Sequence, residues 1–210
     1  PVSYQGYDYA TVLIGEQCWF AENLRAENYA NGDTIPAGLS DSDWENTTSG
    51  AVAVYGEDWG CGNTSPDIDT CDPAQSLNEY GRLYNWYAVD DARGLCPSGW
   101  HVSTDDEWTV MTEYLGGQSI AGAMMKTTYG WYSNDNSSNS SGFSGLPGGQ
   151  RDNYSGNFSN SSQYGFWWTS TLSSPESSLI RYLVHNQNNI SSTGYSFAYG
   201  HSIRCIKDTE

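Results

Sequence analysis

The residues best able to do chemistry in this chain are its cysteines and histidines. No two of the five cysteines stand as Cys-x-x-Cys, the spacing of zinc sites and of thioredoxin-type redox motifs. His101, His185 and His201 have no metal-ligand spacing to one another or to a cysteine. We expect His185 and His201 to lie on or near exposed strands. The sequence therefore contains no local motif for a zinc centre or a redox pair.

The cysteine positions fit disulfides better than free thiols. Cys61 and Cys71 flank a loop rich in Gly, Pro and Asp, which suits a local disulfide. Cys96 and Cys205 flank the C-terminal half, which suits a long-range bridge, and Cys18 is left over. The alternative is a set of reduced, buried thiols in a cytosolic protein. We favour the oxidised arrangement and, with it, an extracellular or cell-surface location.

An acidic loop is the main candidate for a metal site, and Asp41 with Asp43 is a weaker one. Asp67, Asp69 and Asp72 are closely spaced hard oxygen ligands of the kind that bind Ca²⁺. Their spacing does not match the twelve-residue EF-hand loop. The strings Glu-Pro-Asn and Gln-Pro-Asp, found in many calcium-dependent sugar-binding lectins, do not occur. The alternative is a solvated acidic loop, and Ca²⁺ is the only cofactor that the sequence suggests.

Residues 129–201 have the composition of a binding surface. Tyr, Ser, Gly and Asn dominate this segment, and these residues are enriched in antibody paratopes because Tyr supplies rigid contact area while small polar residues adapt. The alternative is a soluble, loop-rich surface without a ligand. The predicted ligand-binding residues are Tyr182, Asn186, Asn188, Tyr195 and Tyr199.

Asn-x-Ser/Thr sequons are frequent, and chance supplies many of them in a chain so rich in Asn and Ser. The glycosylation candidates are Asn46, Asn63, Asn136, Asn139, Asn153, Asn157, Asn160 and Asn189.

Charge and hydropathy exclude two classes of partner. The formal net charge is −17 with only 8 Lys and Arg, so phosphate binding to nucleic acid and attraction to an anionic membrane surface are not expected. No stretch approaches the roughly 20 apolar residues of a membrane span, so we expect no membrane insertion. The chain opens at Pro1 rather than Met, which we interpret as a trimmed, exported product.

The sequence pattern predicts a mixed α+β fold in a single domain, residues 1–210. We expect a β-hairpin over residues 4–20, helices near 79–92 and 105–115, and a short third helix near 121–126. Thr104 and Glu107 form a capping-box pattern before the second helix. Residues 129–208 lose helical periodicity and read as strands separated by long ordered loops. The β-prone runs there are 166–171, 179–184 and 201–206.

Six ordered strings carry a resemblance to a known family. They are 14–24 (IGEQCWFAENL), 80–86 (YGRLYNW), 96–102 (CPSGWHV) with 106–108 (DEW), 142–149 (GFSGLPGG), 167–171 (WWTST) and 202–208 (SIRCIKD). In this order, over nearly the whole chain, they resemble the Fibrobacter succinogenes major paralogous domain family.

The resemblance implies a disulfide-stapled C-type-lectin-like fold on secreted and surface proteins of bacteria. In such folds a Cys before the long helix pairs with one in the last strand, which matches Cys96 and Cys205. It also implies that His101, which lies in a family string, is structural and hydrogen-bonded, and that most Trp residues anchor the core. Formylglycine-generating enzymes share this fold, but fold kinship is no warrant for activity, and four of the five cysteines are expected in disulfides. We therefore expect no enzyme.

Two non-enzymatic functions follow as hypotheses. In the first, the chain is a structural subunit that assembles with copies of itself into a bacterial surface fibre or layer, because β-prone residues at 2–9 invite strand addition by a neighbour. In the second, it is an adhesin-like module that binds a glycan or a protein through its Tyr/Asn/Ser-rich C-terminal surface.

Overall fold

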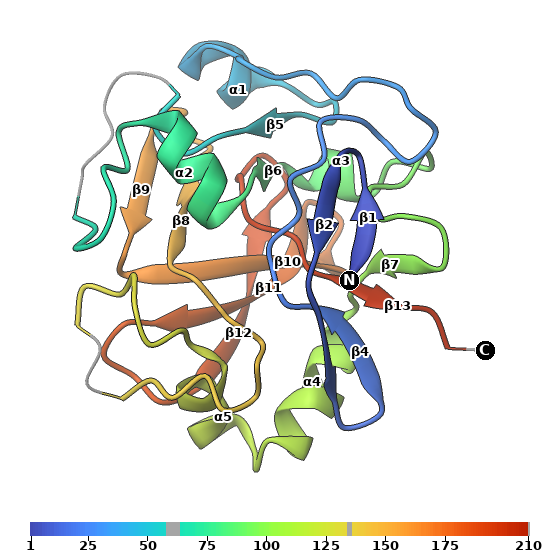
Figure 1. Ribbon diagram of the computed structural model, residues 1–210. Helices are drawn as coiled ribbons and strands as arrows, with labels where there is room; N and C mark the ends of the chain where they lie inside the picture. Colours follow the sequence, from blue (N-terminus) through green and yellow to red (C-terminus); the bar gives the residue numbers. More distant parts are fainter. Residues whose placement is uncertain (58–63, 134–135, 210) are drawn as a thin grey trace.

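The chain forms a mixed α+β structure in which strands outnumber helices (Figure 1). It was analysed as a computed structural model that describes residues 1–57, 64–133 and 136–209. The helices in these ranges are α1 (Asp41–Asn46), α2 (Pro73–Tyr80), α3 (Trp86–Val89), α4 (Asp105–Tyr114) and α5 (Gln118–Met125).

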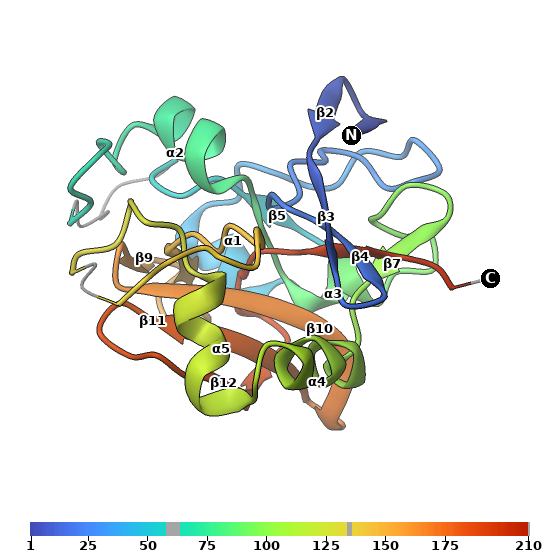
Figure 2. The same ribbon diagram turned by 60° about the horizontal axis from the view of Figure 1, so that its bottom comes forward.

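The largest sheet has five strands in the order β12-β11-β10-β8-β9. Its neighbours pair antiparallel, except that β10 and β8 run parallel. Helices α4 and α5 lie against one face of this sheet, in front of β10 and β11 in Figure 2. Its strands are β8 (Gly148–Arg151), β9 (Phe158–Ser161), β10 (Tyr164–Ser174), β11 (Ser177–Val184) and β12 (Ile190–Ser196).

Three smaller sheets surround it. A four-stranded sheet has the order β3-β4-β13-β7, and two-stranded sheets are formed by β1-β2 and by β5-β6. Their strands are β1 (Val2–Tyr4), β2 (Tyr7–Tyr9), β3 (Thr11–Ile14), β4 (Gln17–Phe20), β5 (Val52–Ala53), β6 (Leu83–Tyr84), β7 (Trp100–Val102) and β13 (Cys205–Lys207).

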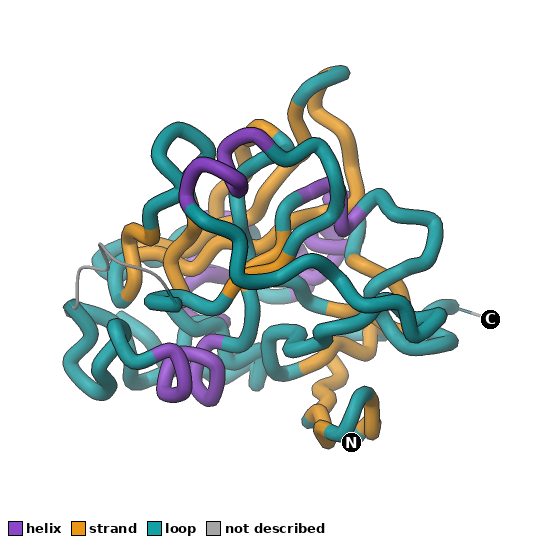
Figure 3. Tube along the Cα trace, turned by 90° about the horizontal axis from the view of Figure 1, so that it is seen from above, coloured by secondary structure: helices purple, strands orange, loops and turns teal. Residues whose placement is uncertain are grey.

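The N-terminal segment differs from the single hairpin predicted over residues 4–20. It contains two hairpins, β1-β2 and β3-β4, each closed by a two-residue turn. Gln5 and Gly6 both have positive φ, the conformation that two-residue hairpin turns need. The β1-β2 hairpin lies at the margin of the molecule, beside the N-terminus in Figure 3.

Of the three predicted helices, the one at 105–115 was correct, the short one near 121–126 is present but begins earlier, and the one at 79–92 was wrong. Helix α4 begins at the Thr104–Glu107 capping box as predicted, and α5 extends the short helix predicted near 121–126. The helix predicted over 79–92 is instead the end of α2, the strand β6 and the single turn α3. The break falls at Gly81, whose φ is +72° and whose absent Cβ would lie 2.9 Å from the Leu24 carbonyl oxygen.

The C-terminal half contains the predicted strands and some that were not predicted. The runs at 166–171 and 179–184 lie in β10 and β11, whereas the run at 201–206 is regular only from Cys205. Strands β8, β9 and β12 were missed because Gly, Ser and Asn dominate them and carry little β propensity.

The core has two large aromatic clusters, one on each face of the main sheet. Alternation along β10 directs Trp167 toward α4 and α5, while Phe166 and Trp168 join the opposite cluster. Of the Trp residues expected to be core anchors, Trp100 is half-buried and the others are buried; the latter are Trp19, Trp86, Trp108 and Trp168.

Buried cations hold the long loops in place. Five of the eight Lys and Arg residues are buried, namely Arg82, Lys126, Arg151, Arg181 and Arg204.

Arg204 is the most central of these cations and is fully buried. Its guanidinium donates to Asn23 Oδ1 at 2.7 Å and to the carbonyl oxygens of Phe20, Phe143 and Ser144 at 3.0, 2.6 and 2.8 Å. It thereby joins β4, the following loop and the 139–147 loop. Burial lowers the pKa of Arg204 to about 9, so the side chain stays protonated at neutral pH.

Arg151 and Lys126 fix two further loops. Arg151 lies between the rings of Trp44 and Phe158 and donates to the Leu39 and Gly156 carbonyl oxygens, both at 2.8 Å. The Lys126 ammonium donates to three carbonyl oxygens of residues 184–187 and to an Asn136 side chain.

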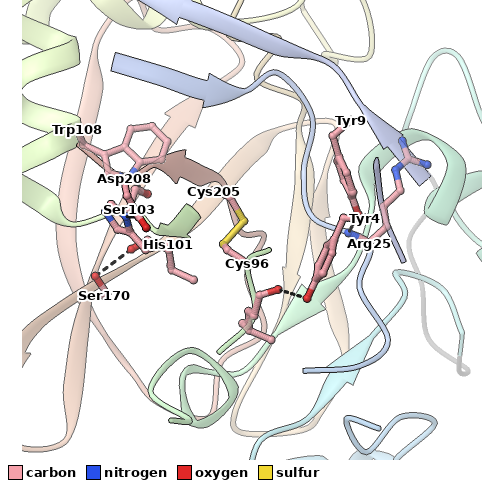
Figure 4. The surroundings of a disulfide bond; sticks show 12 residues. Tyr4, Tyr9, Arg25, Cys96, His101, Ser103, Trp108, Ser170, Cys205 and Asp208 are labelled. Atoms are coloured by element: carbon pink, nitrogen blue, oxygen red, sulfur yellow. Dashed lines mark hydrogen bonds and ion pairs between the residues drawn. A yellow bond between two sulfur atoms is a disulfide. The ribbon is translucent and has the colours of Figure 1, made fainter. Parts of the chain in front are cut away.

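A disulfide links Cys96, which precedes β7 and α4, to Cys205 in the last strand (Figure 4). The Cα atoms are 5.9 Å apart, and 109 residues separate the two cysteines in sequence. This is the pair that the family resemblance implied. Cys18 is a free thiol, and the predicted Cys61–Cys71 pair involves Cys61, which lies outside the described residues.

His101 and Asp208 lie close to this disulfide (Figure 4), and His101 is held by two carboxylates. Its Nε2 lies 2.9 Å from Glu107 Oε1, and its Nδ1 lies 2.7 Å from Asp208 Oδ1. Burial alone would lower the pKa of His101, but the hydrogen bonds and charges of Asp208 and Glu107 outweigh burial and raise it. His101 thus ties the capping box of α4 to the C-terminal segment.

Replacing Arg204 by Met should lower the free energy of unfolding by about 3–5 kcal/mol, because four buried acceptors lose their donor. Urea denaturation measures this change. The matched control is Arg93→Met, at an exposed arginine paired with Asp91, which should cost less than about 1 kcal/mol. Equal losses in the two variants would contradict a special role for Arg204.

Removing the disulfide as Cys96→Ser with Cys205→Ser should cost about 4–5 kcal/mol, because the bridge closes a long loop in the unfolded chain. The same denaturation experiment under oxidising conditions tests it. Cys18→Ser is the control and should leave the midpoint nearly unchanged; a comparable loss there would point to a different pairing.

His101 should make stability depend on pH. Since its folded-state pKa lies above the ordinary value of about 6.5, its contribution is complete below that pH and is lost as pH rises through the raised pKa. The stability difference between wild type and His101→Gln should therefore be larger near pH ~6 than near pH ~8.5. A difference that grows with pH would contradict the assignment.

Candidate ligand-binding surface

Aromatic side chains from three adjacent strands gather on the face of the main sheet opposite α4 and α5. We call this set the tyrosine face; it comprises Tyr164 and Phe166 of β10, Tyr182 of β11, Tyr195 of β12 and Tyr199 of the following loop. The strand register explains the grouping, because Phe166 lies opposite Tyr182 in the antiparallel pair of β10 and β11. All four tyrosines are half-buried, so each presents part of its surface to solvent.

The rings of the tyrosine face contact one another in a continuous array. Tyr164 stacks on Phe166 with centroids 5.3 Å apart, and Phe166 contacts Tyr182 and Tyr195 at 6.0 and 6.1 Å. Tyr195 meets Tyr199 edge-on at 4.7 Å. Such contacts fix ring orientation, so the face is formed before any ligand arrives.

A pocket of about 270 Å³ opens among these rings. Its aromatic walls carry hydroxyl groups, and an amide and a threonine hydroxyl complete the polar lining. Burial raises the pKa of Tyr195, so that hydroxyl stays protonated and able to donate a hydrogen bond at neutral pH. The lining residues are Asn160, Tyr164, Phe166, Tyr182, Thr193 and Tyr195.

His201 forms the floor beneath the tyrosine face and corrects the prediction of an exposed position. It is fully buried, and the rings of Phe166, Trp168, Tyr195 and Tyr199 surround it. Burial lowers its pKa to about 3, so the imidazole is neutral. Among the described residues neither of its ring nitrogens has a hydrogen-bond partner, an arrangement that costs about 1–3 kcal/mol and is offset by packing.

The tyrosine face lies in a segment that is nearly free of charge. Apart from its histidines, the segment 153–203 contains only two charged side chains, Glu176 and Arg181, in a chain of net charge −17. Arg181 turns to the helix side of the sheet, where it donates to Asp105 Oδ1 at 2.6 Å. Neither of the two lines the pocket.

The structure brings together three of the five predicted ligand-binding residues. Tyr182, Tyr195 and Tyr199 belong to the tyrosine face. Asn186 and Asn188 do not, since they lie in the turn between β11 and β12. The Asn188 carbonyl accepts from the Ala123 amide of α5, which places that turn against the helix side. Gly122 permits this contact, because a Cβ there would lie 2.4 Å from the Asn189 carbonyl oxygen.

Tyr164, Phe166, Thr193 and Asn160 line the pocket but were not among the predicted ligand-binding residues. The period-2 spacing of Tyr164, Phe166 and Trp168 is a signal that could have placed Tyr164 and Phe166 on the tyrosine face. The other two could not have been found without the sheet register, because they come from β9 and β12, whose existence the composition hides.

The predicted calcium ligands have other roles. Asp67 Oδ2 accepts from the Gly130 amide at 2.6 Å, and Asp69 Oδ1 accepts from the Cys71 amide at 3.0 Å. Asp72 is the N-cap of α2 and accepts from the Ala74 amide and the Gln75 side chain. Across residues 1–57, 64–133 and 136–209, no group of three or more His, Cys, Asp or Glu side chains is placed to hold a metal. The acidic loop is therefore explained by local hydrogen bonds.

Among the sequons, Asn46 is the best placed for glycosylation because it is exposed at the end of α1. Asn63 lies outside the described residues. The remaining sequon asparagines are half-buried, and they are Asn136, Asn139, Asn153, Asn157, Asn160 and Asn189.

A larger cavity, of about 730 Å³, lies between the β1-β2 hairpin and α2. Arg25 in its wall donates to the Leu77 and Asn78 carbonyl oxygens at the end of α2, both at 3.0 Å, and lies over the Tyr7 ring. Arg82 is paired with Glu27. Because both guanidinium groups hold backbone or a carboxylate, we interpret this cavity as a structural junction. In the part of the chain that is described, no helix is long and apolar enough to cross a membrane.

Comparison with known proteins gives one match. No curated protein and no solved structure shows significant similarity to the chain. The domain described as the Fibrobacter succinogenes major domain matches residues 12–207, which is nearly the whole sequence. The chain therefore belongs to the Fibrobacter succinogenes major domain family.

Proposed function

We propose that this chain is a non-enzymatic extracellular surface domain that recognises a neutral glycan through the tyrosine face. The observation that carries the proposal is the convergence of three half-buried tyrosines, Tyr164, Tyr182 and Tyr195, on a pocket without a charged lining residue. Ligand sites of this kind combine apolar ring surface with a few placed polar groups.

The chemistry of the pocket favours a sugar over an ion. Tyrosine rings offer flat apolar area to the C–H faces of a pyranose, and their hydroxyls meet its hydroxyl groups. Asn160 and Thr193 add hydrogen-bonding groups at the rim. A charged ligand would find no counter-ion in this wall, and leaving its charge unpaired would cost binding energy.

We also propose a C-type-lectin-like fold in an oxidising location, and the disulfide supports both. Cys96 precedes α4 and is bridged to Cys205 in the last strand, the pairing that the resemblance associates with that fold. Disulfides persist mainly in secreted and surface proteins. The family resemblance likewise favours a secreted or cell-surface location.

Four of the eight cysteine and histidine side chains have structural positions, which supports a role without catalysis. Both ring nitrogens of His101 lie within hydrogen-bond distance of carboxylates, and His201 is fully buried. Cys96 and Cys205 are joined in a disulfide, so neither is a free thiol.

Self-association into a surface fibre or layer is the second candidate function. The β1-β2 hairpin favours it, because it is a separate two-stranded sheet at the margin of the molecule whose strands are available for β-augmentation (Figure 3).

A glycan array probed with wild type, Tyr182→Ala and Tyr195→Ala tests the recognition proposal. We expect each substitution to weaken binding to the preferred neutral glycan by roughly tenfold or more, since one ring contact is worth about 1.4 kcal/mol or more. The matched control is Tyr114→Ala, at a tyrosine that is 68% exposed on α4 and should leave binding unchanged.

Circular dichroism must show that the variants are folded. Equal binding by wild type and both tyrosine-face variants, or a preference for anionic over neutral glycans, would contradict the proposed site.

A further inference from the structure

Strand β12 forms one edge of the main sheet, and its outer side has no partner in the described structure. It pairs through seven residues with β11, from Ile190 to Ser196. Among the described segments, no other backbone group bonds to the backbone of residues 191–195. Ser192, Thr193 and Gly194 are exposed. The edge therefore presents a row of free N–H and C=O groups.

This edge has none of the usual protections against strand addition. Edge strands are normally short, or carry Lys, Pro or another charge that blocks pairing. At seven residues β12 is longer than most of the strands here, and its sequence ISSTGYS contains neither a charge nor a proline. The turn that precedes it, 185–189, is also without Asp, Glu, Lys or Arg. The carboxylate that contacts this strand, Asp105 at 3.3 Å from Ser192 Oγ, is paired with Arg181. In a chain of net charge −17, two copies would therefore meet here with little like-charge repulsion.

We infer that β12 pairs antiparallel with β12 of a second copy and that the chain is a two-fold symmetric dimer. Antiparallel pairing of identical strands is self-complementary, because each copy offers the other the same row of donors and acceptors. The two-fold axis passes near Thr193, the central residue of the strand. The five-stranded sheets then join into one continuous sheet of ten strands.

In the dimer the two tyrosine faces lie on the same side of the joined sheet. A two-fold axis that relates antiparallel edge strands stands perpendicular to the sheet, so equivalent faces lie on the same side. The two tyrosine faces, each with Tyr195 on β12, become neighbours on one surface, and α4 and α5 of both copies cover the other. This consequence rests on the proposed recognition function, and it predicts bivalent binding to a repeating glycan.

The same two-fold symmetry limits this contact to two copies, so it cannot by itself build a fibre. An isologous contact uses the same surface on both copies, so it closes at two. Growth into a fibre or layer needs a second contact, for which the β1-β2 hairpin at the opposite end of the chain is the candidate.

Charge-swap variants at Thr193 test the inference directly. Thr193→Lys alone and Thr193→Glu alone place like charges across the axis and should each weaken dimerisation at least about tenfold. An equimolar mixture of the two should restore a one-to-one heterodimer, since opposite charges then face each other. Sedimentation equilibrium and native mass spectrometry of the full chain measure both results.

The matched control is the pair Thr48→Lys and Thr48→Glu, at an exposed threonine in a loop outside the sheet, which should dimerise like wild type. A wild-type chain that remains monomeric at about 100 µM, or Thr193 variants that dimerise as wild type does, would overturn the inference. A folded mixture that forms no heterodimer would also overturn it.

The glycan array keeps this inference separate from the recognition proposal. A monomer whose glycan binding depends on Tyr182 overturns the dimer alone. A dimer that binds no glycan leaves the β12 interface standing and contradicts the function proposed for the tyrosine face.

Discussion

The structure depends on buried cations that bind backbone carbonyl groups. Regular elements are short and loops are long, so much of the chain cannot satisfy its backbone groups within helices and sheets (Figure 3). Arg204, Arg151 and Lys126 provide several donors each at fixed points and meet carbonyl oxygens from segments far apart in sequence. Guanidinium and ammonium groups suit this task because hydrogen bonds from a charged donor are stronger than neutral ones. Aromatic rings packed against Arg151 and Arg204 exclude water from these junctions.

The burial of these cations determines the charge of the molecular surface. Since five of the eight positive side chains are internal, the exterior is dominated by carboxylates. The exception is the segment 153–203, which supplies most of the main sheet and has almost no charge. A neutral aromatic face and a neutral strand edge therefore adjoin one another on an otherwise acidic molecule. Acidic surfaces keep copies apart in most orientations, so contact is directed to the region where repulsion is weakest.

Local signals in the sequence predicted part of this arrangement. The capping box at Thr104 and Glu107 predicted the start of α4, and the β-prone runs 166–171 and 179–184 predicted β10 and β11. The helix predicted over 79–92 was wrong because the helical spacing of Leu83, Trp86 and Val89 suggested a helix, whereas the positive φ of Gly81 ends α2 before them. Strand β12 and the burial of His201 depend on pairing and packing between distant segments. Ser, Gly and Asn carry little β propensity, so the local sequence does not predict either feature. Composition identified Tyr182, Tyr195 and Tyr199, and period-2 spacing along β10 could have added Phe166. Sheet register was needed to add Thr193 and Asn160, and packing against α5 separates Asn188.

Hydrogen exchange of individual loop amides tests most directly whether buried cations fix the loops. The amides of Ser141, Ser144 and Gly145 lie in the loop whose carbonyl groups Arg204 binds, outside any helix or strand. In wild type we expect them to exchange nearly as slowly as the amides of β10. In Arg204→Met they should exchange much faster while β10 and β11 remain protected, because the loop opens without the sheet. Fast exchange of these loop amides in wild type, or the same protection in both proteins, would contradict the account.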